Sequence, residues 1–534
     1  MTAESPESPA ADAPAGSRPG TAVPPDLVAI VVLGAVATVV LGVVGAAAHP
    51  VGDYGVETDF FAELVPEARA WAAGDAPVGR FRGPLYPMLL AAVGAIAPTL
   101  FGAAKAIAAV AAGTLVVLAG VLGRRLYGPR AGLVAAALTA GSPVVVRFGF
   151  TVGTDAVFAA LALGALVALV APRRVSWPAV LAAGVLGGLA ALTRYNGLVL
   201  LAALPVAAAI VADGPARRRV AIAASCAAAF VATLVPWAMH TRAVAGRMLA
   251  NDNHLNLAYT LYGDELGGWD AFWYGDGAAG FAGFGDVVLR DPMRFVGHVL
   301  GEIPAHLVGD AIHVATVPVA VLAVVGVALS IRARPSRREV ATAVLGLALF
   351  GVLLLVFHRP RFSLPLAPLW AVAAGAAISR AVELHAGFAR RAVVVAGAAF
   401  VAQLAIGVPP VARALEAEPR EMLDIVRDAR RLGVTGRVTA RKPHIGYHLG
   451  LPWVAPPPPE SFRDFVVWMV ENDVEWLYMS RIEAMMWPPF EPLLDPAEAP
   501  PVLVPVASSA SPPAVLYRVN AELVRAAMES EPAP

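Results

Sequence analysis

The chain alternates long apolar runs with short polar turns over most of its length. A helix of about 20 apolar residues, within a usual range of roughly 17 to 25, crosses the hydrocarbon core of a bilayer. Eleven runs are of this kind: 27–48, 100–123, 131–148, 155–171, 177–193, 196–212, 219–239, 314–331, 340–357, 362–379 and 392–408. The pattern predicts an α-helical polytopic membrane protein with about 11 transmembrane helices.

Arginines gather in every second turn between these runs, and this placement predicts the orientation of the chain. The residues concerned are Arg124, Arg125, Arg130, Arg173, Arg174, Arg217, Arg218, Arg219, Arg332, Arg334, Arg337, Arg338, Arg380, Arg390 and Arg391. Basic loops remain in the cytoplasm. We therefore expect these turns and the N-terminus inside the cell, and the other loops and the C-terminus outside it.

One further apolar stretch, residues 85–98, does not fit this alternation. Its 14 residues are short for a span, and a crossing here would reverse the orientation of every later helix. We therefore expect residues 50–99 to form one extracytoplasmic loop with juxtamembrane helices, within a transmembrane domain that covers 27–410. A second large outside loop, 240–313, is rich in Asn, Asp, Gly, Trp and Tyr, which suits contacts with sugars.

The two ends of the chain differ from this middle part. Residues 1–26 consist mainly of Pro, Ala, Ser and Glu, which predicts a disordered cytoplasmic tail. Residues 411–534 carry helical periods at 420–433 and 462–473 and strand-like stretches at 436–441, 474–480 and 513–519. This alternation predicts a small extracytoplasmic α/β domain.

Composition supports a membrane protein and excludes some functions. The chain has 534 residues, of which 58% are hydrophobic and 15% charged, and its mean hydropathy is +0.67; soluble domains carry about 25% charged residues. A net charge of zero gives no sign of nucleic-acid binding. The single cysteine, Cys226, cannot form an internal disulfide. The histidines are scattered and no metal motif occurs, so we assign no metal site.

Several arginines lie at the expected outer ends of spans, where the orientation rule predicts few basic residues. Arginine binds phosphate in a bidentate manner, so these side chains could hold a lipid phosphate. Alternatively, they extend toward the headgroups of surrounding lipids. The candidate substrate-binding residues at this side are Arg80, Arg82, Tyr86, Arg194, Tyr195, Asn253, His254, Arg359 and Arg361.

Acidic residues lie at the same side of the membrane. Asp59 and Glu57 are in the first outside loop, and Asp155 begins the span 155–171. These three are the candidate catalytic residues. Each also has a structural alternative, because Asp155 would interact well with a helix dipole and Thr58 or Asp59 would suit a helix N-cap.

A set of sequence motifs resembles the GT-C glycosyltransferase superfamily, in particular the bacterial relatives of protein O-mannosyltransferases and of lipid A aminoarabinose transferases. In order, the motifs are Asp59 followed by ARAWAAGD, RFRGPLYPMLLA, TDAVFAAL, ALTRYNGLVLL, PWAMHTRAVAG and HRPRFSLPLAPLWA. Each motif alone is weak, but their order and common outer side are characteristic. The resemblance implies a GT-C type fold whose first outside loop carries the catalytic aspartate, here Asp59.

The same resemblance implies transfer of a sugar from a polyprenyl-phosphate donor to a glycan, lipid or protein acceptor of the cell envelope. Asp59 would act as general base in an inverting displacement. The chain has Phe60 where such proteins often have a second acidic residue, so Glu57 or Asp53 remains an alternative base. A second carboxylate would orient the acceptor or hold a divalent cation. A transporter or flippase of a lipid-linked sugar, or a non-catalytic cell-wall assembly scaffold, is the alternative function.

The segment RKPHIGY, residues 441–447, follows a predicted strand at the start of the C-terminal domain. Arg441 and Lys442 could contact an acceptor glycan or a lipid phosphate. Alternatively, they are the solvated end of a strand.

Overall fold

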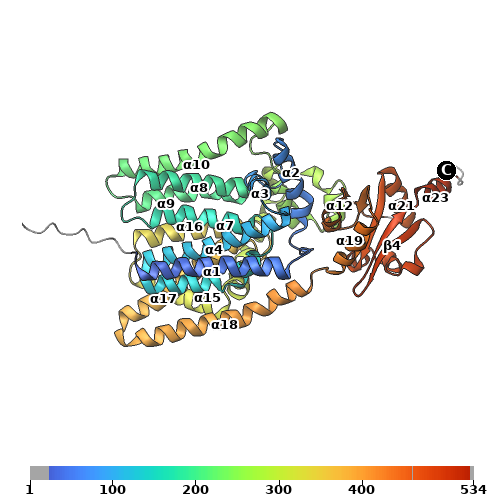
Figure 1. Cartoon of the computed structure of the whole chain (residues 1–534). Coiled ribbons are helices and arrows are strands. Elements are labelled where there is room, and N and C mark those ends of the chain that lie inside the picture. The colour runs from blue at the N-terminus through green and yellow to red at the C-terminus, as the bar shows by residue number, and fades with distance from the viewer. Residues whose placement is uncertain (1–22, 460, 530–534) are drawn as a thin grey trace, which may run out of the picture.

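The computed structural model describes residues 23–459 and 461–529. A bundle of long helices carries a smaller unit with a β-sheet at one of its ends, and the described chain begins at the opposite end (Figure 1). Most of the expected N-terminal tail, residues 1–22, lies outside the described residues. The first helix begins at Pro25, where proline suits the first turn because its missing N–H would have no partner there.

The bundle contains most of the helices predicted from the apolar runs. Their bounds are α1 Pro25–Ala48, α4 Leu100–Tyr127, α5 Pro129–Ala140, α6 Pro143–Phe148, α7 Asp155–Val170, α8 Trp177–Thr193, α9 Leu200–Val211, α10 Ala216–Ala245, α15 Val317–Arg332, α16 Arg337–Leu353, α17 Ala367–Leu384 and α18 Ala389–Glu416. Each of the eleven predicted runs therefore contains at least one helix.

Within the described residues, five helical stretches could cross a membrane by length and composition. A sixth is added if α15 is counted together with the helix before it, from which it is bent by 119°. Shorter apolar helices, among them α7, α8 and the stretch Tyr195–Val211, accompany them. The chain is thus a multi-pass membrane protein, and the exact number of spans stays a prediction.

The run 131–148 is not one continuous helix. Helix α5 ends at Ala140, and α6 begins at Pro143. A proline ring clashes with the carbonyl four residues earlier and lacks the N–H of a helix interior, so it starts a new helix rather than continuing the old one. The break leaves Ser142 free to donate a hydrogen bond to the carbonyl oxygen of Val314, 2.9 Å away.

The first loop contains three short helical segments, and their juxtamembrane position stays a prediction. They are η1 Phe60–Leu64, a π-helix, then α2 Val65–Ala73 and α3 Leu85–Gly94. Helix α2 ends at Gly74, which has φ +95°, a left-handed conformation that suits glycine. The ten residues of α3 span about 15 Å, half of the roughly 30 Å hydrocarbon core, so α3 does not cross the membrane.

Small residues allow the helices of the bundle to approach closely. A Cβ added at Gly113 of α4 would lie 1.9 Å from the hydroxyl oxygen of Thr38 and 2.6 Å from the carbonyl oxygen of Gly34, both on α1. Such contacts between backbones drive helix association where lipid provides no hydrophobic effect. Helix α4 also packs against α5, α7 and α17, which makes it the central helix of this half of the bundle.

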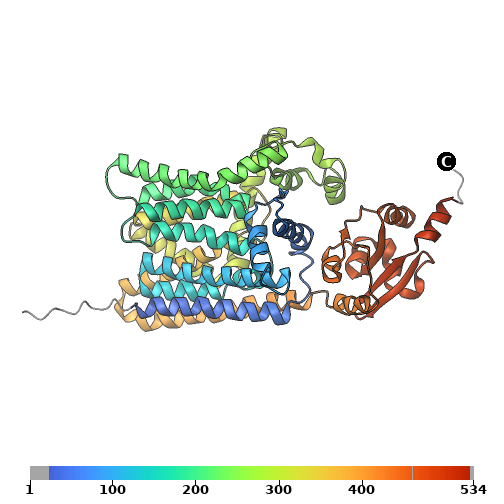
Figure 2. The same ribbon diagram turned by 45° about the horizontal axis from the view of Figure 1, so that its top comes forward.

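The second large loop, between α10 and α15, is mostly helical. It contains α11 Asn253–Tyr262, α12 Gly268–Trp273, α13 Phe284–Arg290, α14 Pro292–Gly309 and the π-helix η4 Asp310–Val314. Figure 2 shows the first loop between the bundle and the C-terminal unit, with residues 250–290 beside it. Both large loops and the C-terminal unit therefore lie at the same end of the bundle.

Residues 421–529 form the unit with the sheet. Its elements are α19 Glu421–Arg431, β1 Arg437–Thr439, α20 His444–Leu449, β2 Trp453–Val454, α21 Phe462–Glu471, β3 Val474–Ser480, α22 Arg481–Met486, β4 Leu503–Ala510, β5 Pro513–Val519 and α23 Ala521–Glu529. The strand order is β2-β1-β3-β5-β4. Strands β1, β2 and β3 are parallel, whereas β5 is antiparallel to β3 and β4.

The two strands at the edges of this sheet were not predicted. Strand β2 has only two residues, and β4 contains Pro505 and a run of small polar residues. Proline cannot donate a ladder hydrogen bond and is confined to positions such as edge strands. Such edge strands have little apolar alternation, which is why the sequence pattern did not show them.

Candidate active site

Asp59 and Arg82 form the centre of the candidate site. Arg82 donates hydrogen bonds through Nη2 to Asp59 Oδ2 and through Nη1 to Glu63 Oε2, the second over 2.8 Å. Asp59 precedes η1 but makes no capping hydrogen bond, so its carboxylate is directed to Arg82 instead of the helix N-terminus. Its side chain is 42% exposed. Asp59 Oδ1 has no hydrogen-bond partner among the described residues, and it can accept a proton.

Three carboxylates on one face of η1 and α2, those of Asp59, Glu63 and Glu67, differ in pKa because their surroundings differ. Burial works against ionisation of Asp59, but the charges of Arg82, Arg361 and Arg194 outweigh it and lower its pKa. Burial raises the pKa of Glu63 despite the contact with Arg82. Burial and the neighbouring Glu63 raise the pKa of Glu67 to about 7. Asp59 is therefore ionised at neutral pH, whereas Glu67 is near its midpoint.

The loop that carries Arg82 is pressed against the end of α8. A Cβ added at Gly83 would lie 2.1 Å from the carbonyl oxygen of Leu192, so no larger residue fits there without a shift of the main chain. This close approach places Arg82 near Arg194, which directly follows α8. The tertiary contact brings together two arginines that are 112 positions apart in the sequence (194 − 82).

Arg80 and Asn253 hold this loop from its other side. Arg80 Nε donates to Asp252 Oδ2 over 3.0 Å, and the main-chain N–H of Asp252 donates to the carbonyl oxygen of Arg80 over 2.8 Å. Asn253 Nδ2 donates to the carbonyl oxygen of Phe81 over 2.9 Å. These contacts join the second loop to the first, which gives both residues a place in the framework of the site.

Asp155 and Arg194 form a second ion pair next to the first. Arg194 Nη1 lies 2.7 Å from Asp155 Oδ1 and 3.0 Å from Thr154 Oγ1. The Arg194 guanidinium lies 5.9 Å from the centre of the Phe362 ring, and that of Arg361 lies 4.9 Å from it. The aromatic ring attracts both cations and holds them at one place.

A pocket opens at this second pair. It is narrow in this structure, with a cavity volume of about 10 Å³. Its polar lining is Asp155, Arg194, Asn196 and Arg361, and its apolar lining includes Phe158, Leu349, Val352, Leu353, Phe362 and Leu366. The pocket thus combines two arginines with an apolar wall made by α7, α16 and the segment before α17.

The loop with Arg359 and Arg361 is held by a group of histidines. His358 Nε2 lies 3.0 Å from Asp310 Oδ1, and Gly309 is packed so closely on the His358 ring that an added Cβ would lie 2.5 Å from it. His306 Nε2 contacts the carbonyl oxygen of Val356 at 3.0 Å. The histidines that are scattered in the sequence therefore partly converge, although in the described part of the chain no three His, Cys, Asp or Glu side chains are placed to hold a metal ion.

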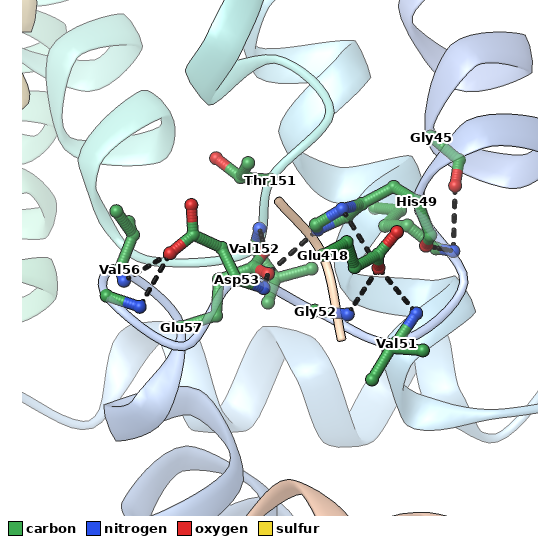
Figure 3. A network of polar contacts seen from close by, with 12 residues as sticks. Gly45, His49, Val51, Gly52, Asp53, Val56, Glu57, Thr151, Val152 and Glu418 are labelled. Atoms are coloured by element: carbon green, nitrogen blue, oxygen red, sulfur yellow. Dashed lines mark hydrogen bonds and ion pairs between the residues drawn. The ribbon is translucent and has the colours of Figure 1, made fainter. Parts of the chain in front are cut away.

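Glu57 occupies a buried polar network, shown in Figure 3, rather than an open site. Its side chain is 0% exposed. Its Oε2 lies 2.7 Å from His49 Nε2 and accepts a hydrogen bond of 2.6 Å from the N–H of Asp53, while Oε1 accepts one from the N–H of Val152. Asp53 in turn accepts hydrogen bonds from two nearby N–H groups and from Arg147. Both carboxylates therefore fix the loop that precedes Asp59.

Glu418 joins the same network from the end of α18. Its Oε1 accepts hydrogen bonds of 2.6 Å from the N–H groups of both Val51 and Gly52, and it lies 3.4 Å from His49 Nδ1 (Figure 3). Residues 367 positions apart are thus joined where the bundle meets the C-terminal unit. Glu418 had no sequence signal, because its role depends only on the tertiary fold.

The remaining predicted residues make other contacts or are exposed. Tyr86 is fully buried in α3, and the buried Tyr195 accepts a hydrogen bond of 2.9 Å from Trp237 Nε1. His254 contacts the carbonyl oxygen of Phe281 at 3.0 Å within the second loop. Arg359 is exposed, with its guanidinium 5.2 Å from the Phe357 ring. The structure thus brings together Asp59, Arg82, Asp155, Arg194 and Arg361 out of the predicted set.

Sequence reasoning missed Glu63 and Glu67. Both follow Asp59 at intervals of four residues, which places them near the same side of a helix. That spacing was a usable signal. The motif instead pointed to the residue next to Asp59, which is not acidic in this chain.

Known proteins share part of this sequence and much of this fold. Residues 81–240 match the family described as dolichyl-phosphate-mannose-protein mannosyltransferase. No curated protein matches the sequence. The fold is similar to that of ArnT from Cupriavidus metallidurans bound to undecaprenyl phosphate, with a TM-score of 0.60, 14% identity, and coverage of 91% of this chain and 97% of ArnT.

A second solved structure also has a similar fold. The archaeal oligosaccharyltransferase AglB from Archaeoglobus fulgidus, solved with an inhibitory peptide and a dolichol-phosphate, matches with a TM-score of 0.57 and 15% identity, over 86% of this chain and 70% of AglB. The family match runs from Phe81 in the first loop to His240 within α10, and the fold likenesses extend over most of the chain. Residues 81–240 are thus similar to that mannosyltransferase family, and the fold of the chain is similar to the folds of ArnT and AglB.

Proposed function

We propose that this protein is a membrane glycosyltransferase that takes a sugar from a polyprenyl-phosphate donor and transfers it to a cell-envelope acceptor on the outer face. The observation that carries the proposal is an ionised carboxylate, Asp59, in the field of Arg82, Arg194 and Arg361, of which Arg194 and Arg361 line a pocket with an apolar wall. The arginines suit a phosphate, and the apolar wall suits the first isoprene units of its lipid.

Asp59 is the proposed general base. Its Oδ1 takes the proton from the acceptor hydroxyl while the hydroxyl oxygen attacks the anomeric carbon of the donor sugar. The bond from that carbon to the phosphate oxygen breaks, and its electron pair leaves with the lipid phosphate. Attack from the face opposite the phosphate inverts the configuration at the anomeric carbon.

Arg194 and Arg361 are the proposed partners of the leaving phosphate. Hydrogen bonds from guanidinium groups are strongest when negative charge increases on the oxygen, as it does when the phosphate leaves. Asp155 would orient Arg194, to which it is paired over 2.7 Å. Arg82 already donates to both Asp59 and Glu63, and it would hold the base in position.

Glu57 and Asp53 are the weaker candidates for the base. Both oxygens of Glu57 accept hydrogen bonds in a solvent-free interior, and Asp53 caps a turn and pairs with Arg147. A divalent cation at Asp59 and Glu63 would have to displace Arg82 from both carboxylates. The proposed displacement requires no cation.

The test uses the purified full chain with a synthetic polyprenyl-phosphate sugar and a cell-envelope fraction as acceptor. We expect release of polyprenyl phosphate together with sugar in the acceptor, and loss of both in Asp59→Asn. Movement of the donor between leaflets without release would instead identify a flippase. Neither release nor movement, with several donor sugars, would favour the scaffold.

A further inference from the structure

Lys442 is an unusual residue in this chain. Only two of its 40 basic residues are lysines, Lys105 and Lys442. Lys105 has a structural role, because its Nζ donates to the carbonyl oxygens of Gly45 and His49 over 2.8 Å and 2.9 Å at the end of α1. A lysine is a compact cation on a flexible stem that differs from arginine in its chemistry. The second lysine therefore requires its own explanation.

Lys442 belongs to the C-terminal unit but lies against the loop of the candidate base. Its Nζ donates to Thr58 Oγ1 over 3.2 Å, and Thr58 directly precedes Asp59. The side chain is half-buried. Among the described residues no carboxylate lies within ion-pair distance of Lys442, whereas most arginines around the site are paired. The ammonium group can therefore donate further hydrogen bonds beside Asp59.

The position of Lys442 is fixed by contacts on both sides of it. The N–H of Arg441 donates to the buried Glu483 carboxylate over 3.1 Å, and the Arg441 side chain contacts Asp270 Oδ1 at 3.3 Å and Tyr274 Oη at 3.0 Å on the second loop. After Lys442, His448 Nε2 contacts the carbonyl oxygen of Val51 at 2.8 Å. Lys442 is therefore not the solvated end of a strand.

The electrostatic surroundings agree with a binding role. Burial, reinforced by the charge of Arg441, lowers the pKa of Lys442, although Asp59, Glu483 and Asp53 oppose this effect. Partial burial of a cation without a paired carboxylate favours binding of an anion, because the anion would compensate the loss of hydration. A positive charge at this point also balances the charge of Asp59 when a second negative group arrives.

We propose that Lys442 binds the acceptor of the transfer reaction and that the acceptor carries an anionic group, a phosphate or a carboxylate, close to the hydroxyl that receives the sugar. The proposal rests on the glycosyl transfer proposed above and adds the chemical class of its acceptor. The C-terminal unit, through residues 441–448, would then supply a substrate contact that the transmembrane part lacks.

The first test measures anion binding without any transfer. The full chain is treated with pyridoxal phosphate, an anionic aldehyde whose carbonyl condenses with an amine with loss of water, and the imine is reduced with borohydride. With only two lysines to compare, mass spectrometry gives an unambiguous result. We expect modification of Lys442 at a rate at least about tenfold above that of Lys105, because the Lys105 amine is held by two carbonyl oxygens and that of Lys442 by one hydroxyl, and one hydrogen bond of a charged group corresponds to about that factor.

In the same experiment, competing sugars test whether the ligand of Lys442 is anionic. Glucose 6-phosphate and glucuronate should protect Lys442 from modification, and glucose should not. Absence of modification at Lys442, or equal protection by the neutral sugar, would overturn the proposal. A failure of glycosyl transfer would leave this test intact, so the two proposals can fail separately.

The second test compares variants in transfer to the envelope fraction. In Lys442→Met the amount of acceptor needed for half-maximal rate should rise about tenfold, with the half-saturating donor concentration unchanged, and Lys442→Arg should restore part of the loss. Arg427→Met removes an exposed cation of α19 that is paired with Asp424, and it is the matched control. An unchanged acceptor requirement in Lys442→Met, or an effect on the donor alone, would contradict the proposal.

Discussion

Glu57 and Asp59 are two residues apart, yet they have opposite surroundings. Glu57 is 0% exposed, and both of its oxygens are engaged by main-chain N–H groups and His49. Asp59 is 42% exposed, keeps one oxygen without a partner among the described residues, and lies in the field of three arginines. The presence of an acidic residue in a motif therefore does not identify it as the reactive residue. The reactive carboxylate is the one that the fold leaves incompletely satisfied.

The largest expected effect separates the two residues by activity. Asp59→Asn keeps the size of the side chain but cannot take the acceptor proton, and a general base contributes roughly 10²–10⁴-fold to the rate. We expect sugar transfer to fall by at least that lower factor, with the melting temperature close to that of the parent. Turnover by Glu57→Gln, measured per folded molecule, is the control and should remain near that of the parent.

If Asp59→Asn retains its turnover while Glu57→Gln loses it at unchanged stability, the roles of the two residues are exchanged.

The reverse experiment tests the structural side of the comparison. In Glu57→Gln the amide nitrogen must face an N–H donor, since the carboxylate accepts on both oxygens. Breaking a buried charged network costs roughly 3–5 kcal/mol. We therefore expect a clear drop in the melting temperature in detergent, followed by light scattering or intrinsic fluorescence. A parent-like melting curve would show that the buried network contributes little.

The substitution Arg361→Ala removes one of the three positive charges near Asp59. Hydrogen bonds to charged groups contribute roughly 1.5–3 kcal/mol, and each 1.4 kcal/mol corresponds to tenfold, so kcat/KM for the donor should fall at least about tenfold. Arg359→Ala is the matched control, because Arg359 is exposed on the same loop. Equal effects of both substitutions, or none in either, would remove Arg361 from the donor site.

The smallest expected effect concerns Glu67, the third carboxylate of the series. Its pKa is about 7 in the folded protein, above its ordinary value of 4.5, so the folded state binds more protons between these pH values. Stability should therefore decline from about pH 4.5 to about pH 7 and be independent of this group above that range. Glu67→Gln should flatten this decline in melting temperature by a few degrees at most.

The decline should be larger in the parent than in Glu67→Gln at every ionic strength. If the two proteins show the same dependence on pH, Glu67 does not titrate as described.

Much of the fold was readable from the pattern of apolar runs. Each run contains a helix because about 20 apolar residues have no other low-energy arrangement in lipid. The left-handed Gly74 at the end of α2 was likewise predictable, since glycine adopts that conformation at little cost. The breaks within runs and the edge strands β2 and β4 were not predictable from the sequence, because they depend on packing rather than on local preference.

The candidate site was predictable only in part. The pairing of Arg82 with Asp59 and Glu63 joins positions within one loop, and its members were within reach of a pattern. The approach of Arg194 and Arg361 to Asp59 depends on tertiary packing. Gly83 lies against α8, and the Phe362 ring contacts both guanidinium groups.

By itself, the sequence determined that the chain is a multi-helical membrane protein with acidic and basic residues gathered in a few loops, because hydropathy acts on every residue regardless of its neighbours. Only the tertiary structure decided which carboxylate is buried in the Glu418 network, which one remains open to the arginines, and that Lys442 lies beside it. Charge and exposure at one atom depend on groups that are hundreds of positions apart in the chain, such as Thr58 and Lys442, 384 positions apart.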